Sequence, residues 1–322
     1  MRILVIGAGA IGGYFGGRLL QAGQDVTFLV RARRALQLER SGLRIQSPLG
    51  HITLHDPATV QAEHLHTHFD LVVLSCKAYD LDGVIRDMAP AVGPQTAILP
   101  LLNGMRHLDA LDAAFGRQRV LGGQCMIAAT LDADGVIVHL NDTHHLVFGE
   151  RGGERSERVE RIAQAFASAQ VDVRASSQII HEMWEKWVFL TTLAASTCLM
   201  RAPIGAILAA PSGRALIEGL LETCLGVSQA AGHAPRAAFL ERTHAILTTQ
   251  GSTLTASMLR DIENGSRIEA DHIVGDMLQR RVEAGLESTG TSALCVAYTH
   301  LKAYEARRAA AAGQAADGAL PA

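Results

Sequence analysis

The stretch that most constrains the fold of this chain is VIGAGAIGGYFGGRLLQAG, near its start. Three of its glycines, Gly7, Gly9 and Gly12, are spaced as G-x-G-x-x-G and follow the short apolar run Arg2–Ile6. Such a run is typical of a buried parallel strand. Apolar residues at helical spacing come next, and a second strand-like run covers Asp25–Val30. The sequence therefore predicts a strand, a glycine turn, a helix and a second strand in one unit.

This order of elements is typical of a dinucleotide-binding unit. The first glycine of the pattern permits a tight turn, the second lets a pyrophosphate approach the backbone, and the third lets the helix pack closely on the strand. The N-terminus of the helix offers unpaired N–H groups to the phosphates. A glycine-rich turn without a ligand is the alternative, and the matching strands and helix disfavour it. We predict that the cofactor-binding loop comprises Gly7, Ala8, Gly9, Ala10, Ile11 and Gly12.

The end of the second predicted strand indicates which dinucleotide is bound. NAD-binding units usually carry an acidic residue there for the ribose 2′-hydroxyl. Here the strand leads into Arg31, Arg33 and Arg34, and the first carboxylate is Glu39. Guanidinium groups match a phosphate in charge and in geometry. We therefore hypothesise that the cofactor is NADP(H), with Arg31 on the 2′-phosphate. The alternative is that these arginines are the solvated start of a helix.

Composition excludes several classes of protein. The chain has 322 residues, of which 48% are hydrophobic, enough for two domains with cores of their own. Its net charge of −3 shows no basic footprint for nucleic acid. Five cysteines without a C-x-x-C pair favour reduced thiols. The chain opens directly on a strand, and its most apolar stretch, 187–200, is too short to span a bilayer. We expect a cytoplasmic protein without nucleic-acid or membrane partners.

The pattern along the chain predicts two domains of different class. Strand and helix signals alternate through about residue 175, including a hairpin of LRIQS and HITLH and separate strands VIVHL and HLVFGE. Beyond that point helical periodicity continues to about residue 308. We predict an α/β fold: a Rossmann-type doubly wound NADP-binding domain at 1–177, a helical substrate-binding and catalytic domain at 178–308, and a frayed or disordered tail at 309–322. The apolar helical domain permits a homodimer without requiring one.

Two polar residues follow predicted strands of the first domain. Lys77 comes after Asp70–Ser75, and Asn103 lies at the end of the apolar run that begins at Thr96. Ligands of parallel sheets sit beyond the carboxyl ends of the strands, so Lys77 suits the cofactor's phosphates or ribose and Asn103 the nicotinamide ribose or substrate. The alternatives are a solvated lysine and a turn-forming Asn-Gly.

Candidate residues in the second domain fall in two segments. In HEMWEKWVFLTTLAA, Lys186 stands between two tryptophans of an apolar helix, where its ammonium either reaches solvent or enters a site as a proton donor. In SMLRDIENGSRIEAD, Ser257 and Asp261 share one helix face, Gly265 permits a turn, and Glu269 begins the next helix. Serine suits a substrate carboxylate or hydroxyl, and the alternative for this segment is an ordinary surface helix-turn-helix.

Taken together and in order, these motifs resemble the ketopantoate reductase (2-dehydropantoate 2-reductase) family over nearly the whole chain. The resemblance is carried by the glycine loop, Arg31, CKAYD with Lys77, Asn103-Gly104, Ala129, Trp184-x-Lys186, Ser257-Met258-x-x-Asp261, Gly265 and Glu269.

The resemblance implies reduction of a 2-keto acid by NADPH, ketopantoate to pantoate in pantothenate biosynthesis. It also implies a helical domain like that of 6-phosphogluconate dehydrogenase. Lys186 is then the general acid, Asn103 and Ser257 lie near substrate or nicotinamide, and Ala129 and Glu269 lie near the cofactor. Substrate binding is thereby assigned to Asn103, Lys186 and Ser257.

The chain departs from the family pattern one and two turns after Lys186. Well-studied members carry asparagines there, whereas this chain has Leu190 and Ala194. Neither side chain forms hydrogen bonds. On a helix, Thr191 and Thr192 are rotated from Leu190 by roughly 100° and 200°, so they point elsewhere. A different, more apolar 2-keto acid is therefore a competing substrate. A non-catalytic NADP(H) sensor is a further alternative, although it has no use for a proton donor.

Three histidines, His64, His66 and His68, stand at alternate positions in HLHTH. On a strand they would share one face and suit a metal ion. Because they lie among polar residues before a strand, we expect an exposed loop instead, and the predicted mechanism requires no metal.

Overall fold

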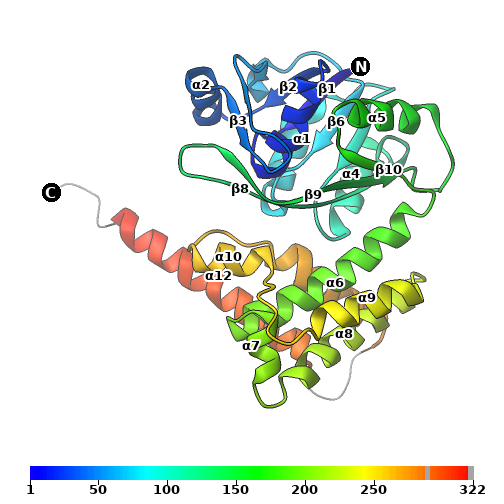
Figure 1. Cartoon of the computed structure of the whole chain (residues 1–322), viewed down its shortest axis with the longest axis vertical. Coiled ribbons are helices and arrows are strands. Elements are labelled where there is room, and N and C mark those ends of the chain that lie inside the picture. Colours follow the sequence, from blue (N-terminus) through cyan, green and yellow to red (C-terminus); the bar gives the residue numbers. More distant parts are fainter. Residues whose placement is uncertain (287–290, 318–322) are drawn as a thin grey trace. The chain divides into compact units, whose positions relative to one another are not determined.

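The structure, a computed structural model, describes residues 1–286 and 291–317. The chain forms two compact units, Met1–Met183 and Trp184–Ala322 (Figure 1). The division lies within helix α6 (Ile179–Met200), slightly beyond the boundary predicted after residue 177.

A parallel sheet forms the centre of the first unit. In the described residues it has five strands in the order β5-β2-β1-β6-β7. Ile3 of β1 lies opposite Val26 of β2 on one side and Leu71 of β6 on the other, and every residue of β1 after Arg2 is buried. The strands are β1 (Arg2–Ile6), β2 (Asp25–Leu29), β5 (Thr59–Val60), β6 (Leu71–Leu74) and β7 (Ala97–Pro100). The predicted parallel sheet with flanking helices is confirmed.

A second sheet, in the order β10-β9-β3-β4 with β8 paired to β9, belongs to the same unit. The predicted hairpin is β3–β4, antiparallel, but it joins this sheet and not the parallel one. VIVHL and HLVFGE are one strand, β9, because β8 pairs along its length, with a register shift between Ile127 and Ala129. The strands are β3 (Leu43–Gln46), β4 (Ile52–Leu54), β8 (Gly122–Leu131), β9 (Ile137–Gly149) and β10 (Asp172–Ala175).

Helix α1 (Ala10–Gln21) packs against both sheets, and its glycines make this possible. A Cβ at Gly16 would lie 2.6 Å from the ring of Phe28 in β2, and one at Gly17 would lie 2.8 Å from Ile45 in β3. One at Gly13 would lie 2.5 Å from Ile137 in β9. Side chains at these positions would therefore push α1 away from one sheet or the other.

The remaining elements of the first unit connect and flank these strands. They are α2 (Ala32–Ser41), η1 (Ala62–His64), η2 (Ala78–Asp80), α3 (Leu81–Met88), η3 (Ala89–Ala91), α4 (Arg106–Phe115), η4 (Arg117–Arg119) and α5 (Glu157–Ser168). Helix α5 begins later than its predicted start at Arg151, because the Ser156 hydroxyl caps it by accepting the Val159 N–H.

In the described residues of the second unit every regular element is a helix, as predicted. After α6 it comprises α7 (Ile204–Ala209), α8 (Gly213–Ala230), α9 (Ala237–Leu247), α10 (Ser257–Glu263), a π-helical turn η5 (Asp271–Gly275), α11 (Asp276–Glu283) and α12 (Ala293–Asp317). None of the described helices is long and apolar enough to cross a membrane.

Helix α12 extends into the segment for which a frayed or disordered tail was predicted. It continues through residues 309–317, and 318–322 lie outside the described residues. The segment lacks an apolar face, but alanine has the highest intrinsic helix propensity and extends an existing helix without one.

Candidate active site

The glycine loop after β1 has the geometry that a dinucleotide requires. Gly7 has φ +84°, a conformation that favours glycine, and its N–H donates to the Leu29 carbonyl at 2.9 Å. A Cβ at Gly12 would lie 2.2 Å from Ser75 Oγ and 2.3 Å from the Gly7 carbonyl oxygen. A Cβ at Gly9 would meet nothing within 4 Å. The protein's own packing thus explains Gly12 but leaves space beside Gly9, where a pyrophosphate would approach.

Neighbouring loops hold the glycine loop in place. The Ser75 hydroxyl, directly after β6, donates to the Ile6 carbonyl at 3.0 Å. Arg34 Nε donates to the Ala8 carbonyl at 3.0 Å. The first turn of α1 contains no acidic residue, so its partial positive charge is available to an anion. These features fit a bound diphosphate.

Arg31 lies between β2 and α2, at the edge of the sheet where the glycine loop lies. Its side chain is 81% exposed, and Nη2 lies 3.1 Å from Oδ2 of Asp80. Arg33 is exposed, whereas Arg34 is half-buried against the glycine loop. Helix α2 begins at Ala32, so the arginine run does stand at the start of a helix. Arg31 directly precedes that helix, and its exposed side chain is accessible to a ligand.

Three further predicted cofactor residues of the first unit lie at different places in the fold. Lys77 is exposed and precedes η2, in the loop after β6. Asn103 is half-buried after β7 and is followed by Gly104 with φ +82°. Ala129 is half-buried in the second sheet, on β8 opposite His139. Lys77 and Asn103 thus each follow a parallel strand, as predicted, and the structure shows that these strands, β6 and β7, are adjacent.

Helix α6 carries Lys186 in the second unit. Lys186 is half-buried, and the tryptophans on either side, Trp184 and Trp187, are 3% and 1% exposed. Trp187 Nε1 and Thr191 Oγ1 both donate to the Ile273 carbonyl, at 3.0 and 3.2 Å. That carbonyl belongs to the π-helical turn η5, a feature often found at functional sites. These bonds fix the rotation of α6 relative to η5.

The residues that replace the family's asparagines keep helical register with Lys186. Leu190 is half-buried and Ala194 is 2% exposed, one and two turns beyond the lysine. Thr191 is fully buried on Ile273, and the Thr192 hydroxyl donates to the Val188 carbonyl at 2.9 Å. The prediction that neither threonine replaces an asparagine is consistent with these bonds.

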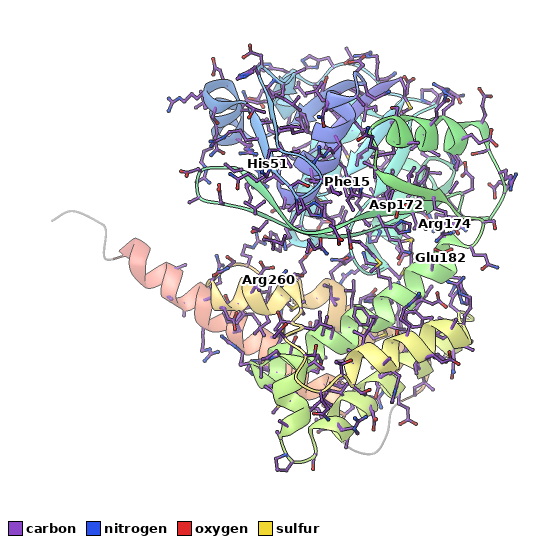
Figure 2. The ribbon with its side chains drawn as sticks, in the orientation of Figure 1. Phe15, His51, Asp172, Arg174, Glu182 and Arg260 are labelled. Atoms are coloured by element: carbon purple, nitrogen blue, oxygen red, sulfur yellow. The ribbon has the colours of Figure 1, made fainter. Side chains whose placement is uncertain are left out.

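Two buried carboxylates of α6, Glu182 and Glu185, precede Lys186 in the sequence. Glu182 accepts from Arg174 Nη1 and Nη2 of β10 at 3.1 and 2.5 Å and from Ser176 Oγ at 2.7 Å. Figure 2 shows Arg174 and Glu182 side by side. Glu185 accepts from Arg236 N and Nε, each at 2.9 Å, and from Nη2. These pairs tie α6 to β10 and to the start of α9, and no sequence pattern predicted them.

The segment after α9 brings Ser257 close to α6. The Ala256 N–H donates to Thr197 Oγ1 of α6 at 3.3 Å, so α10 begins beside the turn that follows Ala194. Ser257 is exposed, and Asp261 is half-buried one turn later on the same helix. Glu269 is half-buried, and its carbonyl accepts the Ile273 N–H at 3.1 Å. Glu269 thus begins the next helical segment, which is π-helical in its first turn.

Lysine is rare in this chain, which sharpens the assignment of Lys186. The sequence contains three lysines, Lys77, Lys186 and Lys302. Lys302 is paired with Asp271 at 3.0 Å and Glu305 at 2.5 Å. Arginine stays protonated in proteins, so it binds anions but does not donate a proton. A chain that uses arginine for most of its positive charge therefore offers few lysines for acid–base chemistry.

The histidines at 64, 66 and 68 occupy η1 and the loop after it and are exposed, as expected. Among the described residues no group of three or more His, Cys, Asp and Glu side chains is arranged to hold a metal ion.

Both units of the chain match a known protein family. Residues 3–153 match the family described as ketopantoate reductase PanE/ApbA, and residues 178–305 match the C-terminal part of the same family. The chain belongs to the ketopantoate reductase family. The predicted family and fold are thereby confirmed. Because the family's named members are reductases, the relationship supports an oxidoreductase.

Individual relatives cover nearly the whole chain. An uncharacterized oxidoreductase YkpB of Bacillus subtilis is 38% identical over 96% of this chain and 100% of its own. A 2-dehydropantoate 2-reductase of Mesorhizobium japonicum is 30% identical over 85% of this chain and 89% of its own. The crystal structure of the 2-dehydropantoate 2-reductase of Geobacter metallireducens superposes with a TM-score of 0.84 at 27% identity, covering 94% of this chain and 99% of that one.

A further solved structure shares the fold at lower identity. The ternary structure of D-mandelate dehydrogenase with NADH and anilino(oxo)acetate has a TM-score of 0.84 at 18% identity, over 96% of this chain and 99% of that one.

Proposed function

We propose that this protein reduces a 2-keto acid to the 2-hydroxy acid with NADPH, and that 2-dehydropantoate is the first candidate substrate. The observation that carries the proposal is Lys186, one of three lysines, half-buried on a helix fixed by buried hydrogen bonds. The family and the relatives named 2-dehydropantoate 2-reductase support this reaction class.

Residues of the first unit, together with Glu269 of the second, would hold the cofactor. The open space beside Gly9 and the N-terminus of α1 suit the pyrophosphate, and Gly7 and Gly12 give the loop its shape. Ala8, Ala10 and Ile11 form the rest of this cofactor-binding loop. Arg31 suits the 2′-phosphate, Lys77 and Asn103 follow adjacent strands, and we assign Ala129 and Glu269 to the cofactor by family resemblance. When bound, NADPH would supply the hydride for the carbonyl carbon.

Lys186 would supply the proton. As hydride reaches the carbonyl carbon, negative charge grows on the carbonyl oxygen, and the Lys186 ammonium stabilises that charge and then donates a proton to the oxygen. The step would leave the 2-hydroxy acid, NADP⁺ and a neutral Lys186 amine, and that amine would regain a proton from solvent. Ser257, exposed at the start of α10, and Asn103 are assigned to orienting the substrate.

A more apolar 2-keto acid is the second candidate substrate. Leu190 and Ala194 present only carbon atoms on the turns after Lys186, so they favour a hydrocarbon chain over a hydroxyl group. D-mandelate dehydrogenase, which shares the fold, was solved with NADH and the aromatic compound anilino(oxo)acetate, so aromatic 2-keto acids and both nicotinamide cofactors belong in the test.

The deciding experiment follows the absorbance loss of NADPH, and separately of NADH, with 2-dehydropantoate, aliphatic 2-keto acids and an aromatic 2-keto acid. We expect Lys186→Ala and Lys186→Arg each to lower kcat by about 10²–10⁴, because the arginine keeps the charge without donating the proton. Lys302→Arg is the matched control, since it replaces a lysine that is already paired with carboxylates.

The possible results separate the candidates. Fast turnover of 2-dehydropantoate that depends on Lys186 supports the first substrate, and turnover of another keto acid alone supports the second. Full activity of Lys186→Arg would disprove the role of Lys186. Tight NADPH binding without turnover of any keto acid would point to a sensor.

A further inference from the structure

The ion pair between Arg31 and Asp80 occupies an informative place in the first unit. In the parallel sheet, β2 and β6 are the two neighbours of β1. Arg31 follows β2, Asp80 lies in η2 after β6, and the glycine loop follows β1. The pair therefore joins the loops on either side of the glycine loop, at the edge where parallel sheets bind ligands.

The two partners differ in how firmly they are held. The side chain of Arg31 is 81% exposed, whereas that of Asp80 is 28% exposed. The Asp80 N–H also donates to the Lys77 carbonyl at 2.9 Å, which fixes the backbone of η2. Asp80 is thus the more enclosed partner on a fixed backbone, and the exposed Arg31 side chain has room to exchange one partner for another.

We infer that Asp80 is a cofactor-specificity residue that competes with the 2′-phosphate of NADPH for Arg31 and so narrows the preference for NADPH over NADH. This inference rests on the proposed function, because it assumes that Arg31 receives that phosphate. An Arg31 N–H group that points at the Asp80 carboxylate cannot point at the phosphate at the same time, and a carboxylate beside a phosphate dianion is repelled by it.

NADH has no 2′-phosphate, so the same carboxylate acts on it differently. Acidic residues near the adenine ribose are the usual acceptors for its 2′-hydroxyl. The chain lacks one directly after β2, and Asp80 offers a carboxylate from the far side of the glycine loop instead. Asp80 therefore disfavours NADPH while remaining compatible with NADH.

The test measures binding, independently of turnover. Dissociation constants for NADPH and NADH are determined by calorimetry at low salt on wild type, Asp80→Asn, Arg31→Ala and the double variant. Asp82→Asn is the matched control, because it removes the same charge from an exposed residue two positions further on. Urea unfolding of each variant verifies that the fold is retained.

We expect Asp80→Asn to tighten NADPH binding by about two- to fivefold, the scale of an exposed ion pair, and to leave NADH binding equal or weaker. In the Arg31→Ala background the same substitution should change NADPH binding less than twofold, because the guanidinium for which the carboxylate and the phosphate compete is then absent. A gain confined to NADPH that vanishes without Arg31 supports the inference.

Other outcomes overturn it in distinguishable ways. Weaker NADPH binding in Asp80→Asn would show that Asp80 orients Arg31 and does not compete. An equal effect of Asp82→Asn, or an effect that persists without Arg31, would show a general charge effect. If wild type binds NADPH and Asp80→Asn leaves it unchanged, the inference fails while the proposed function stands. If wild type binds neither dinucleotide, both fail.

Discussion

At the scale of single residues, two glycines of the same loop, Gly9 and Gly12, are required for different physical reasons. Gly12 is enclosed, because a Cβ would meet both Ser75 Oγ and the Gly7 carbonyl oxygen, whereas a Cβ at Gly9 would meet open space. Gly9 also has φ −83°, which any residue adopts. Gly12 therefore serves the fold, and Gly9 serves a ligand that approaches from outside.

This difference predicts opposite phenotypes for two alanine substitutions. Gly12→Ala should lower the free energy of unfolding by about 1–3 kcal/mol or more, the scale of overpacking a core. Gly9→Ala should leave stability nearly unchanged and weaken NADPH binding by roughly ten- to a hundredfold, since the new methyl group displaces the pyrophosphate. Urea unfolding and calorimetric titration of both variants check this, and unchanged NADPH affinity in Gly9→Ala would remove that residue from the site.

At the scale of elements, helix α6 sets the position of Lys186. The helix is held through Trp187 and Thr191 to η5 and through Glu185 to Arg236 at the start of α9. The Glu185 carboxylate is almost fully buried, whereas Arg236 is about half exposed. Glu185 does not need to touch the substrate to affect catalysis, so we regard it as a positioning residue.

Loosening this attachment should lower kcat more than it changes cofactor binding. We expect Glu185→Gln to lower kcat by roughly tenfold, because small misplacements of a catalytic group are costly, and to leave the NADPH dissociation constant unchanged. Arg236→Lys, which keeps the charge but loses the planar fork, should give an intermediate kcat. Glu218→Gln is the control, since Glu218 forms an exposed pair with Arg214 on α8. A loss of stability with unchanged kcat would contradict the positioning role.

At the scale of the whole molecule, stability should depend on pH through a histidine in the first unit. His144 Nδ1 lies 2.9 Å from the hydroxyl of Tyr14, which is fully buried on α1. Burial lowers the pKa of His144 below its ordinary value of 6.5, and the neighbouring His139 and Arg18 lower it further, against an opposing effect of Asp172. The fold therefore favours the neutral imidazole.

The sign of the effect follows from proton linkage. The unfolded chain takes up the proton near pH 6.5, whereas the folded chain takes it up at lower pH. The stabilising contribution is complete above about pH 6.5 and is lost as pH falls through the pKa of the folded state. In urea unfolding between pH 7.5 and 5, we expect the His144→Gln variant to lose less stability than wild type. His64→Gln, at an exposed position, is the control, and equal pH dependence of wild type and His144→Gln would contradict this account.

The sequence by itself determined the elements whose signals are local. The spacing of Gly7, Gly9 and Gly12 after an apolar run predicted β1, the turn and α1, since turn geometry and helix periodicity involve neighbours along the chain. The same holds for the four-residue step between Ser257 and Asp261 on α10. The residues of the candidate site were named from such patterns together with the family resemblance.

Only the tertiary structure decided which surfaces meet. It placed the predicted hairpin in a second sheet, merged two predicted strands into β9, and showed that Gly13 and Gly17 let α1 approach that sheet. It also paired Arg31 with Asp80 and Glu185 with Arg236, residues 49 and 51 positions apart. Such contacts have no periodic signature, because they depend on where separate elements pack and not on the order of residues within one.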